Sequence, residues 1–469
     1  MDHTEPHFAD VEPDSASRRE FLKRSAALSA VTAAAPFALN LAAIGEAAAA
    51  TASDYKALVC VFLAGGNDYA NTVVPYDPTT WGLYNGLRSN LAYSRASLAS
   101  TVLTPTVPLP NGVQYALAPQ LSALLPLFNS TVLAPVMNVG TLVEPTTKAQ
   151  YFAQNVNLPP KLFSHNDQQS YWQSSASEGS RSGWGGRMGE LFASSNGNSV
   201  FTCIGTSGNA VFLSGKTQAQ YQVTNSGSIP VFSIKNGALA GSGACSVALK
   251  NAMTTPRTHL LENELIRISK RSIDSDIELT NALVGSSMTS SFPNTSLASQ
   301  LKLVAKLISV RNTLNVKRQV FFVSLGGFDN HDKLTALHPP LLQMVGDAMA
   351  AFYQSTVDMG IADKVTTFTG SDFGRTLVAN DDGSDHGWGA THFVMGGAVK
   401  GKSFVGTSPS FVKDGPDDVG RGRILPTTSV DQMAATLGNW FGLSPTEQLA
   451  VLPNLTNFSV SSRNLGFMI

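Results

Sequence analysis

Short apolar runs alternate along the chain with longer segments of helical periodicity. The longest runs span residues 56–63, 319–325 and 364–369, and each leads into glycine, while shorter runs occupy 131–139 and 392–395. Runs that are apolar throughout are typical of strands buried on both faces, as in a parallel sheet. The pattern therefore predicts a sheet that is covered by other elements on both sides.

Helical segments separate these runs. We expect helices at about 119–128, 334–359 and 430–441. Strands that alternate with helices indicate a doubly wound, mostly parallel α/β sheet.

The middle of the chain differs in composition from both ends. About 196–244 is rich in Gly, Ser, Thr and Asn, and two helical stretches follow at about 258–273 and 296–314. We expect residues 51–469 to form one α/β domain in which about 196–315 is a Gly/Ser-rich insertion or cap on the sheet.

The first 50 residues have the organisation of an export signal. Residues 17–23 (SRREFLK) fit the twin-arginine pattern at every position, and an alanine-rich apolar stretch at 26–44 precedes small residues at 47–50 that offer a cleavage site. We expect a twin-arginine signal peptide at 1–50, the twin-arginine translocase as a partner during export, and a periplasmic or secreted protein. Such signals are read by a receptor and are not anchors, and no later stretch resembles a bilayer span, so we expect no stable membrane anchor.

Charge and cysteine content narrow the function classes. Charged residues make up 14% of the chain and the net charge is −1, with no basic block, so there is no electrostatic case for nucleic acid. The three cysteines form neither a disulfide framework nor a Cys-x-x-Cys pair. We expect Cys60 to pack in a strand, and leave open whether Cys203 and Cys245 bridge after export. Without a cysteine cluster or a G-x-G-x-x-G loop, an oxidoreductase is the weakest functional alternative.

Carboxylates and imidazoles gather after the predicted strands. In open α/β sheets ligands bind outside the carboxyl ends of the strands, and such side chains suit Zn, Mn or a similar divalent ion. Asp68 alone is equally compatible with a helix cap or an Asx turn. The residues that we expect to hold one or two ions (Zn, Mn, Mg or Ca) are Asp68, Asp329, His331, Asp372 and His386.

A second polar segment, residues 163–172, carries Ser164 and His165. Ser164 at a helix N-terminus is a candidate nucleophile, but with Asp167 three residues later it also resembles a capping box. His165 is a candidate site residue, and Arg375 or His165 is a candidate for binding an anionic group.

The order of these motifs resembles one family, the bacterial exported proteins gathered as domain-of-unknown-function family 1501. The motifs are residues 65–75 (GGNDYANTVVP), 164–165 (SH), 327–331 (GFDNH), 371–376 (SDFGRT), 385–387 (DHG), 395–401 (MGGAVKG) and 465–467 (LGF). The resemblance implies an alkaline phosphatase and sulfatase-like fold whose enzymes have a two-metal site. It makes Asp68 the first-strand ligand, Asp329 and His331 the next pair, Asp372 the following carboxylate and His386 the late histidine.

The chain departs from the enzymes of that superfamily at three points. Asp329 and His331 are two residues apart rather than one helical turn, Asp372 is followed by Phe373 rather than His, and no clear nucleophile follows the first strand. The motifs nevertheless predict a metal-dependent hydrolase of small phosphate or sulfate esters, in which Ser164 or a metal-bound water attacks. The alternative is a non-catalytic envelope or extracellular binding and assembly protein that keeps the fold.

Overall fold

The computed structural model describes residues 52–224, 227–235 and 239–469. These residues belong to one of two compact units, Thr51–Ile469, and the other unit is Met1–Ala50. The predicted signal peptide lies outside the described residues.

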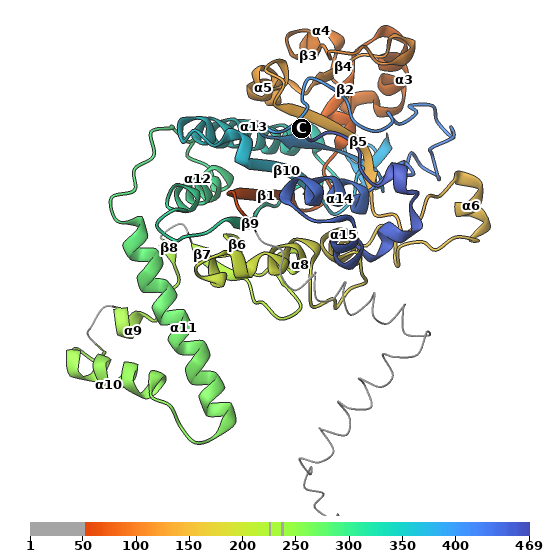
Figure 1. Ribbon diagram of the computed structural model, residues 1–469. Helices are drawn as coiled ribbons and strands as arrows, with labels where there is room; N and C mark the ends of the chain where they lie inside the picture. The colour runs from red at the N-terminus through yellow and green to blue at the C-terminus, as the bar shows by residue number, and fades with distance from the viewer. Residues whose placement is uncertain (1–51, 225–226, 236–238) are drawn as a thin grey trace, which may run out of the picture. The chain divides into compact units, whose positions relative to one another are not determined.

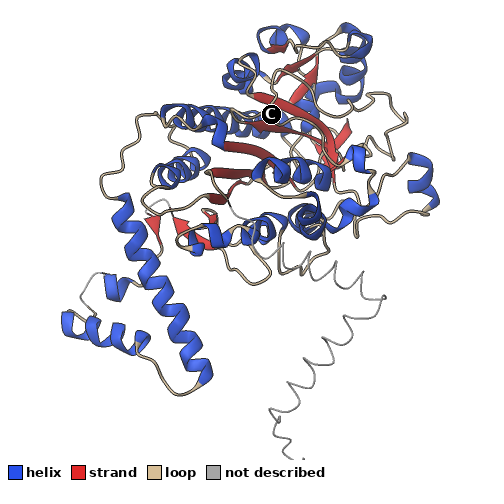
Figure 2. Ribbon diagram, in the orientation of Figure 1, coloured by secondary structure: helices blue, strands red, loops and turns tan. Residues whose placement is uncertain are grey.

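A nine-stranded mixed sheet forms the centre of the described domain (Figures 1 and 2). Its order is β14-β5-β13-β10-β1-β9-β6-β7-β8. All strands run the same way except β13, which is antiparallel to β10 and β5, and β8, which is antiparallel to β7. The bounds are β1 Lys56–Leu63, β5 Leu133–Gly140, β6 Cys203–Gly205, β7 Tyr221–Thr224, β8 Gly227–Ser228, β9 Arg318–Leu325, β10 Val365–Ser371, β13 Ala390–Met395 and β14 Thr428–Ser429. The predicted mostly parallel α/β fold is confirmed.

Helices cover both faces of this sheet because its central strands carry apolar side chains on both sides. In β1, Ala57, Val59 and Val61 belong to one hydrophobic core with residues of α12 and α13. Phe62 points to the other face, where its ring centroid lies 5.7 Å from that of Trp172. The covering helices are α12 Ser296–Ser309 and α13 Leu334–Asp358 on the first face, and α7 His165–Ser174, α8 Trp184–Leu191, α14 Val430–Phe441 and α15 Pro445–Val451 on the second.

Smaller elements surround the sheet. One hairpin, formed by β11 Arg375–Ala379 and β12 Ser384–His386, pairs Arg375 with His386 across its strands. The helix expected at 119–128 is a 3-10 helix, Pro119–Leu124, followed by a short α-helix, since Pro126 lacks the N–H that a continuous helix needs. The remaining elements are β2 Val73–Pro75, β3 Val102–Leu103, β4 Tyr115–Leu117, α3 Pro78–Arg88, α4 Arg95–Leu98, α5 Leu125–Asn129 and α6 Lys148–Ala153.

The segment expected as an insertion or cap divides into two parts. Strands β6, β7 and β8 extend the main sheet, and α12 packs against it. Only α9 Phe232–Lys235, α10 Gly243–Thr254 and α11 Leu260–Leu283 project from the domain, as Figure 1 shows. We call these three helices the helical extension. Three-residue strands such as β6 leave too short an apolar pattern to be distinguished from loop in the sequence.

The three cysteines, all within the described residues, are unbonded. Cys60 is buried in β1, Cys203 is buried in β6 and Cys245 is exposed on α10. The structure therefore does not join Cys203 to Cys245. No described helix has both the length and the apolar character that crossing a bilayer requires.

Candidate metal site

Three histidines converge on Asp329, which follows β9. The Nε2 atom of His331 lies 3.0 Å from Asp329 Oδ1, and that of His386 lies 3.2 Å from the same oxygen. The Nε2 atom of His165 lies 3.4 Å from Asp329 Oδ2. These residues come from the loop after β9, the end of β12 and the start of α7, so the fold assembles them from three distant segments.

Two of the rings are fixed through their Nδ1 atoms. His165 Nδ1 lies 2.6 Å from Asp372 Oδ2, and His386 Nδ1 lies 2.7 Å from the carbonyl oxygen of Phe163. A neutral imidazole carries one N–H, so donation from Nδ1 leaves the Nε2 lone pair directed at Asp329. Metal-binding histidines typically show this arrangement. Phe163 also has a φ of +73°, a left-handed conformation rare for a bulky residue.

His331 completes the cluster. Its Nδ1 atom lies 3.4 Å from Asp385 Oδ1, and its Nε2 atom lies 2.9 Å from His386 Nε2. At this distance one imidazole donates an N–H to the other, or a cation lies between the two nitrogens. The pair is therefore compatible with a bound cation and with a shared proton.

The donor atoms form a compact group. One ligand atom each from His165, Asp329 and His386 lies within 4.8 Å of the others, and among the described residues this is the group that could hold a metal ion. His165 Nε2 is buried and has no hydrogen-bond partner in the described part of the chain. An unpartnered buried nitrogen beside a carboxylate and a second imidazole is the donor set of a divalent metal site.

Asp372, expected as a ligand, lies behind His165. Its Oδ2 atom faces His165 and accepts a hydrogen bond from Gln169 Nε2 at 2.8 Å, while Oδ1 accepts one from the N–H of Gly65 at 3.1 Å. The carboxylate is buried and its acceptor sites are filled. Asp372 therefore orients His165 and does not share the donor group with Asp329.

The structure places Asp68 in a separate buried ion pair. Its Oδ2 atom accepts a hydrogen bond from Arg88 Nη2 of α3, and both side chains are buried. Asp68 precedes a 3-10 helix but makes no capping hydrogen bond there. The expected first-strand ligand is thus neutralised by Arg88 and is not in the group that could hold a metal. The capping alternative is not realised either.

Arg375 and Ser164 also differ from their expected roles. The Arg375 side chain is buried and donates from Nη1 to Asp329 Oδ1 at 2.7 Å, so it holds the central carboxylate and is not free to bind an anion. The Ser164 hydroxyl donates to Asp167 Oδ2 at 2.9 Å. It accepts no hydrogen bond from a backbone N–H of α7, so Ser164 and Asp167 do not form a capping box.

Burial and the neighbouring charges shift the pKa values of Asp329, His165 and His386. Burial raises the pKa of Asp329, but the hydrogen bond and charge of Arg375 outweigh burial and hold it below its ordinary value. The hydrogen bond to Asp372 raises the pKa of His165. Burial lowers the pKa of His386, and the charge of Arg375 lowers it further. The neutral form of His386 is therefore favoured, as a metal ligand requires.

Gln169 and Asp385 were not among the expected site residues. Gln169 lies one helical turn after His165 on α7, so the i, i+4 spacing is the signal that could have found it. Asp385 stands next to His386, and Asn380 Nδ2 donates to its Oδ1 at 2.7 Å. Both support a histidine of the cluster, directly or through Asp372.

Residues 55–454 match the model of the family described as "Protein of unknown function (DUF1501)". This chain belongs to DUF1501. The expected family membership is confirmed over most of the chain. A search of curated proteins gives no match.

Solved structures similar to this DUF1501 protein include a sulfatase, the protein Ps i-CgsB and a lipoteichoic acid synthase. PsFucS1 sulfatase from Pseudoalteromonas sp. has 8% identity and a TM-score of 0.37, with 88% of this chain and 72% of that chain covered. Ps i-CgsB, in complex with k-i-k-neocarrahexaose, has 9% identity, a TM-score of 0.35 and coverages of 88% and 77%. The lipoteichoic acid synthase LtaP from Listeria monocytogenes has 8% identity, a TM-score of 0.34 and coverages of 87% and 78%. At these TM-scores the likeness carries no argument about activity.

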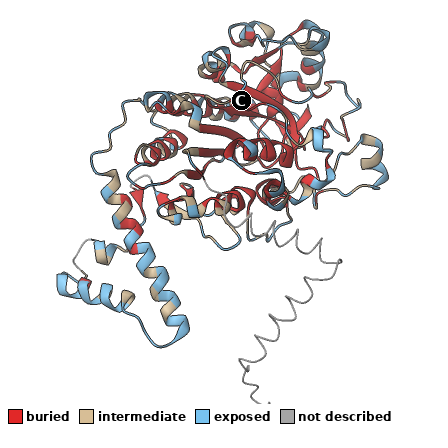
Figure 3. Ribbon diagram, in the orientation of Figure 1, coloured by how far each residue is buried: buried red, intermediate tan, exposed pale blue. Residues whose placement is uncertain are grey.

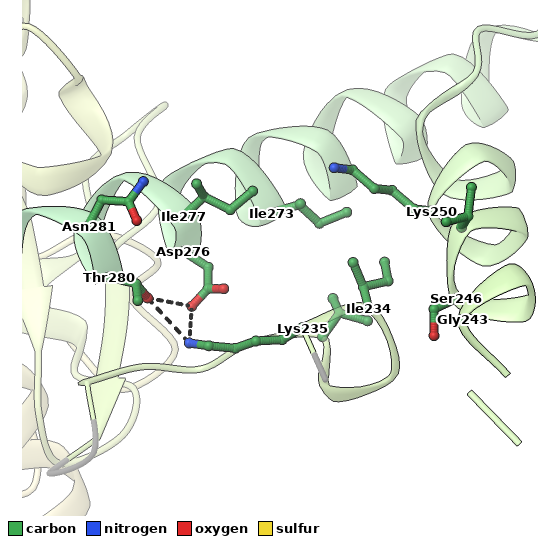
Figure 4. Close-up of a pocket in the computed structure, with 12 residues that line it drawn as sticks. Ile234, Lys235, Gly243, Ser246, Lys250, Ile273, Asp276, Ile277, Thr280 and Asn281 are labelled. Carbon is green, nitrogen blue, oxygen red and sulfur yellow. Dashed lines mark hydrogen bonds and ion pairs between the residues drawn. The ribbon is translucent and has the colours of Figure 1, made fainter. Parts of the chain in front are cut away.

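Two cavities of this DUF1501 protein lie in different surroundings. One of about 440 Å³ adjoins the histidine cluster and shares Gln169 with it. Another of about 580 Å³ lies within the helical extension, and Figure 4 shows Lys235 bonded to Asp276 there, with Ile234, Ile273 and Ile277 also in the lining. None of the expected site residues lines either cavity, but the first includes Gln169, which donates to Asp372, so volume alone does not mark the chemistry.

Proposed function

We propose that this DUF1501 protein is a metal-dependent hydrolase of phosphate or sulfate esters. The observation that carries the proposal is the convergence of three imidazole Nε2 atoms on Asp329, two of them with Nδ1 fixed by a strong acceptor. This arrangement directs nitrogen lone pairs toward one point, where a cation would bind them.

His165, Asp329 and His386 would hold the ion, and His331 is positioned to join them. Imidazole nitrogens suit Zn, whereas carboxylate oxygens suit Mg, Ca and Mn, so this imidazole-rich donor set favours Zn. A divalent ion supplies a Lewis acid that stabilises negative charge developing on an ester oxygen. The role of Arg375 is to hold Asp329, and the role of Asp372 is to hold His165.

Water is the attacking group in this proposal. Among the described residues, no Ser, Thr or Cys side chain hydrogen-bonds to His165, Asp329 or His386. The Ser164 hydroxyl, the candidate nucleophile, is engaged by Asp167. Ser164→Ala is accordingly expected to leave hydrolysis within a few-fold of wild type.

Export is the second component of the proposal. The twin-arginine pattern at residues 17–23 supports translocation of the folded chain to the periplasm or beyond. Replacing both Arg18 and Arg19 with Lys should retain the protein in the cytoplasm, as measured by cell fractionation. Unchanged export of that variant would contradict this component.

The metal and the activity are tested together on the purified chain lacking residues 1–50. We expect about one divalent ion per chain by elemental analysis, and hydrolysis of aryl phosphates or sulfates. Asp329→Ala should lose both, whereas the matched control His259→Ala, which changes an exposed histidine of the extension, should retain both. Absence of bound metal and of hydrolysis in the wild-type chain would refute the proposal.

A non-catalytic exported binding protein is the second candidate. It is favoured by the pairing of Asp68 with Arg88, which removes a carboxylate expected at the first strand, and by the absence of a side-chain nucleophile among the hydrogen-bond partners of the described cluster. It predicts metal binding without turnover of any ester. The same experiment therefore separates the two candidates.

A further inference from the structure

The cavity of about 440 Å³ opens at the same end of the sheet as the histidine cluster. Phe62 and Ala64 line it at the end of β1, and Phe322 and Ser324 line it at the end of β9. Its volume falls in the range of about 300–1,000 Å³ that small-molecule sites occupy. We call this cavity the polar groove.

The polar groove is physically joined to the candidate metal site. Gln169 lines the groove and donates to Asp372, which in turn fixes His165. Ala64 also lines the groove, and the N–H of the next residue, Gly65, binds the same carboxylate. A molecule that fills the groove would therefore contact Gln169, which reaches His165 through Asp372.

Several polar side chains of the groove are uncommitted. Asn166, Ser207, Asn209 and Glu178 are exposed, and their side chains make no hydrogen bond to any other described residue. Amides and hydroxyls both donate and accept, and the carboxylate accepts. These groups are available for a ligand whose own groups both donate and accept.

The groove offers no positively charged side chain to an anion. Among the described residues that line it there is no Lys, Arg or His, and its one charged residue is Glu178. A further phosphate or sulfate placed there would meet a carboxylate without a compensating cation. The part-exposed apolar residues that line the groove are Ala64 and Val211, whereas Phe62 and Phe322, which also line it, are buried.

We propose that the polar groove binds a neutral, polyhydroxylated group, so that the substrate is a sugar-type phosphate or sulfate ester. Sugar hydroxyls match the free amides and hydroxyls, and the C–H faces of the ring match the part-exposed apolar residues. The ester group then occupies the histidine cluster while the sugar occupies the groove. This inference rests on the proposed function for its ester, but the groove is tested separately.

The kinetic test uses a double variant, Asn166→Ala with Asn209→Ala. Both side chains are exposed and make no hydrogen bond to the described chain, so the fold should be retained. The substrates are glucose and galactose monophosphates and monosulfates, compared with p-nitrophenyl phosphate and sulfate. The ratio of kcat/KM for sugar ester to kcat/KM for aryl ester should fall at least about tenfold, since each lost hydrogen bond to a ligand costs about 1 kcal/mol or more.

The matched control is Asn251→Ala, which removes an exposed asparagine of α10, outside the groove. It should leave the sugar-to-aryl ratio at the wild-type value. An unchanged ratio in the groove variant, or an equal loss for both substrate classes, would overturn the proposal for the groove while leaving the hydrolase proposal standing.

A binding measurement separates the groove from catalysis. Saturation-transfer NMR of lactose and cellobiose with the Asp329→Ala chain reports sugar contact without turnover. We expect a signal that the added Asn166→Ala and Asn209→Ala changes abolish. Sugar binding without ester hydrolysis by the wild-type chain would refute the proposed function and keep the groove, and no signal together with no sugar preference would refute the groove.

Discussion

The histidine cluster and the helical extension show opposite ways of building a polar region. At the cluster two of the three rings are fixed by a carboxylate or a carbonyl, and Asp372 and Arg375 behind it are buried. The extension encloses a larger cavity, yet much of it is exposed (Figure 3), including most of its charged residues and large apolar side chains such as Leu261 and Leu265. Asp276, which lines the cavity, is buried. Convergence of fixed donor atoms, rather than cavity size, therefore identifies the site.

The ion pairs of the two regions differ in the same way. In α11, Arg267 pairs with Glu264 at 2.6 Å and Lys270 with Asp274 at 2.5 Å, all largely exposed. Such surface pairs are screened by water and contribute little to stability. The Asp68–Arg88 pair, in which Asp68 follows strand β1, is fully buried. Loss of one partner there leaves an uncompensated charge.

Arg88→Ala should have the largest effect on stability of the changes considered. It leaves Asp68 buried without its cation and should lower the free energy of unfolding by about 3–5 kcal/mol. Lys235→Ala in the extension should cost less than about 1 kcal/mol, because Lys235 is part-exposed and Asp276 keeps its bond from Ser228. Urea denaturation measures the free energy of unfolding of each variant. Similar losses in the two would contradict the stated difference between the buried and the exposed ion pair.

Asp372→Asn should weaken metal binding without unfolding the chain. The amide is a poorer acceptor for His165 Nδ1, and loss of such an orienting carboxylate typically costs about 10–100-fold in metal affinity. Asp274→Asn on α11 is the matched control and should have no effect on affinity. Equal affinities of wild type and Asp372→Asn in a metal competition titration would contradict the orienting role.

Gly65→Ala should weaken metal binding less than Asp372→Asn does. Gly65 has a φ of +117°, and a Cβ there would lie 2.5 Å from the backbone nitrogen of Asp329. The strain should cost about 1–3 kcal/mol and displace Asp329. Gly285→Ala also changes a positive-φ glycine but meets open space, so it should cost only the conformational strain. Equal metal affinities for the two variants would argue against the tight packing at Asp329.

Asp431→Asn should change the pH dependence of stability. Burial raises the pKa of Asp431 to about 6 from an ordinary 3.8. The folded state therefore binds more protons than the unfolded state between these values, and the free energy of unfolding falls as pH rises from about 4 to 6. The variant should lose that slope and be more stable than wild type at pH 8. Parallel stability profiles in denaturant at several pH values would contradict this.

The strands of the sheet centre were predictable because each is a buried apolar run. β1, β9 and β10 lie within two residues of the expected bounds. The nearness of Asp329 and His386 also follows from placing polar residues after strands, whereas His165, at the start of α7, was expected to bind an anion and not a metal. β6 and β7 were not predicted, because three or four residues do not establish a periodicity.

The separate roles of the carboxylates could not be read from the sequence. Asp68, Asp329 and Asp372 each follow a strand, yet one pairs with Arg88, one receives the histidines and one lies behind His165. The difference depends on which side chain the fold brings opposite each carboxylate. Arg88 lies on a separate helix, and no local sequence pattern predicts its contact with Asp68.

Anomalous scattering from crystals of the chain grown with Zn or Mn tests the central claim most directly. The account predicts a single strong peak within about 2–2.3 Å of His165 Nε2, His386 Nε2 and a carboxylate oxygen of Asp329. Crystals of Asp329→Ala grown in the same way should lack it. No peak at this cluster in the wild-type chain, with metal bound elsewhere or not at all, would contradict the account.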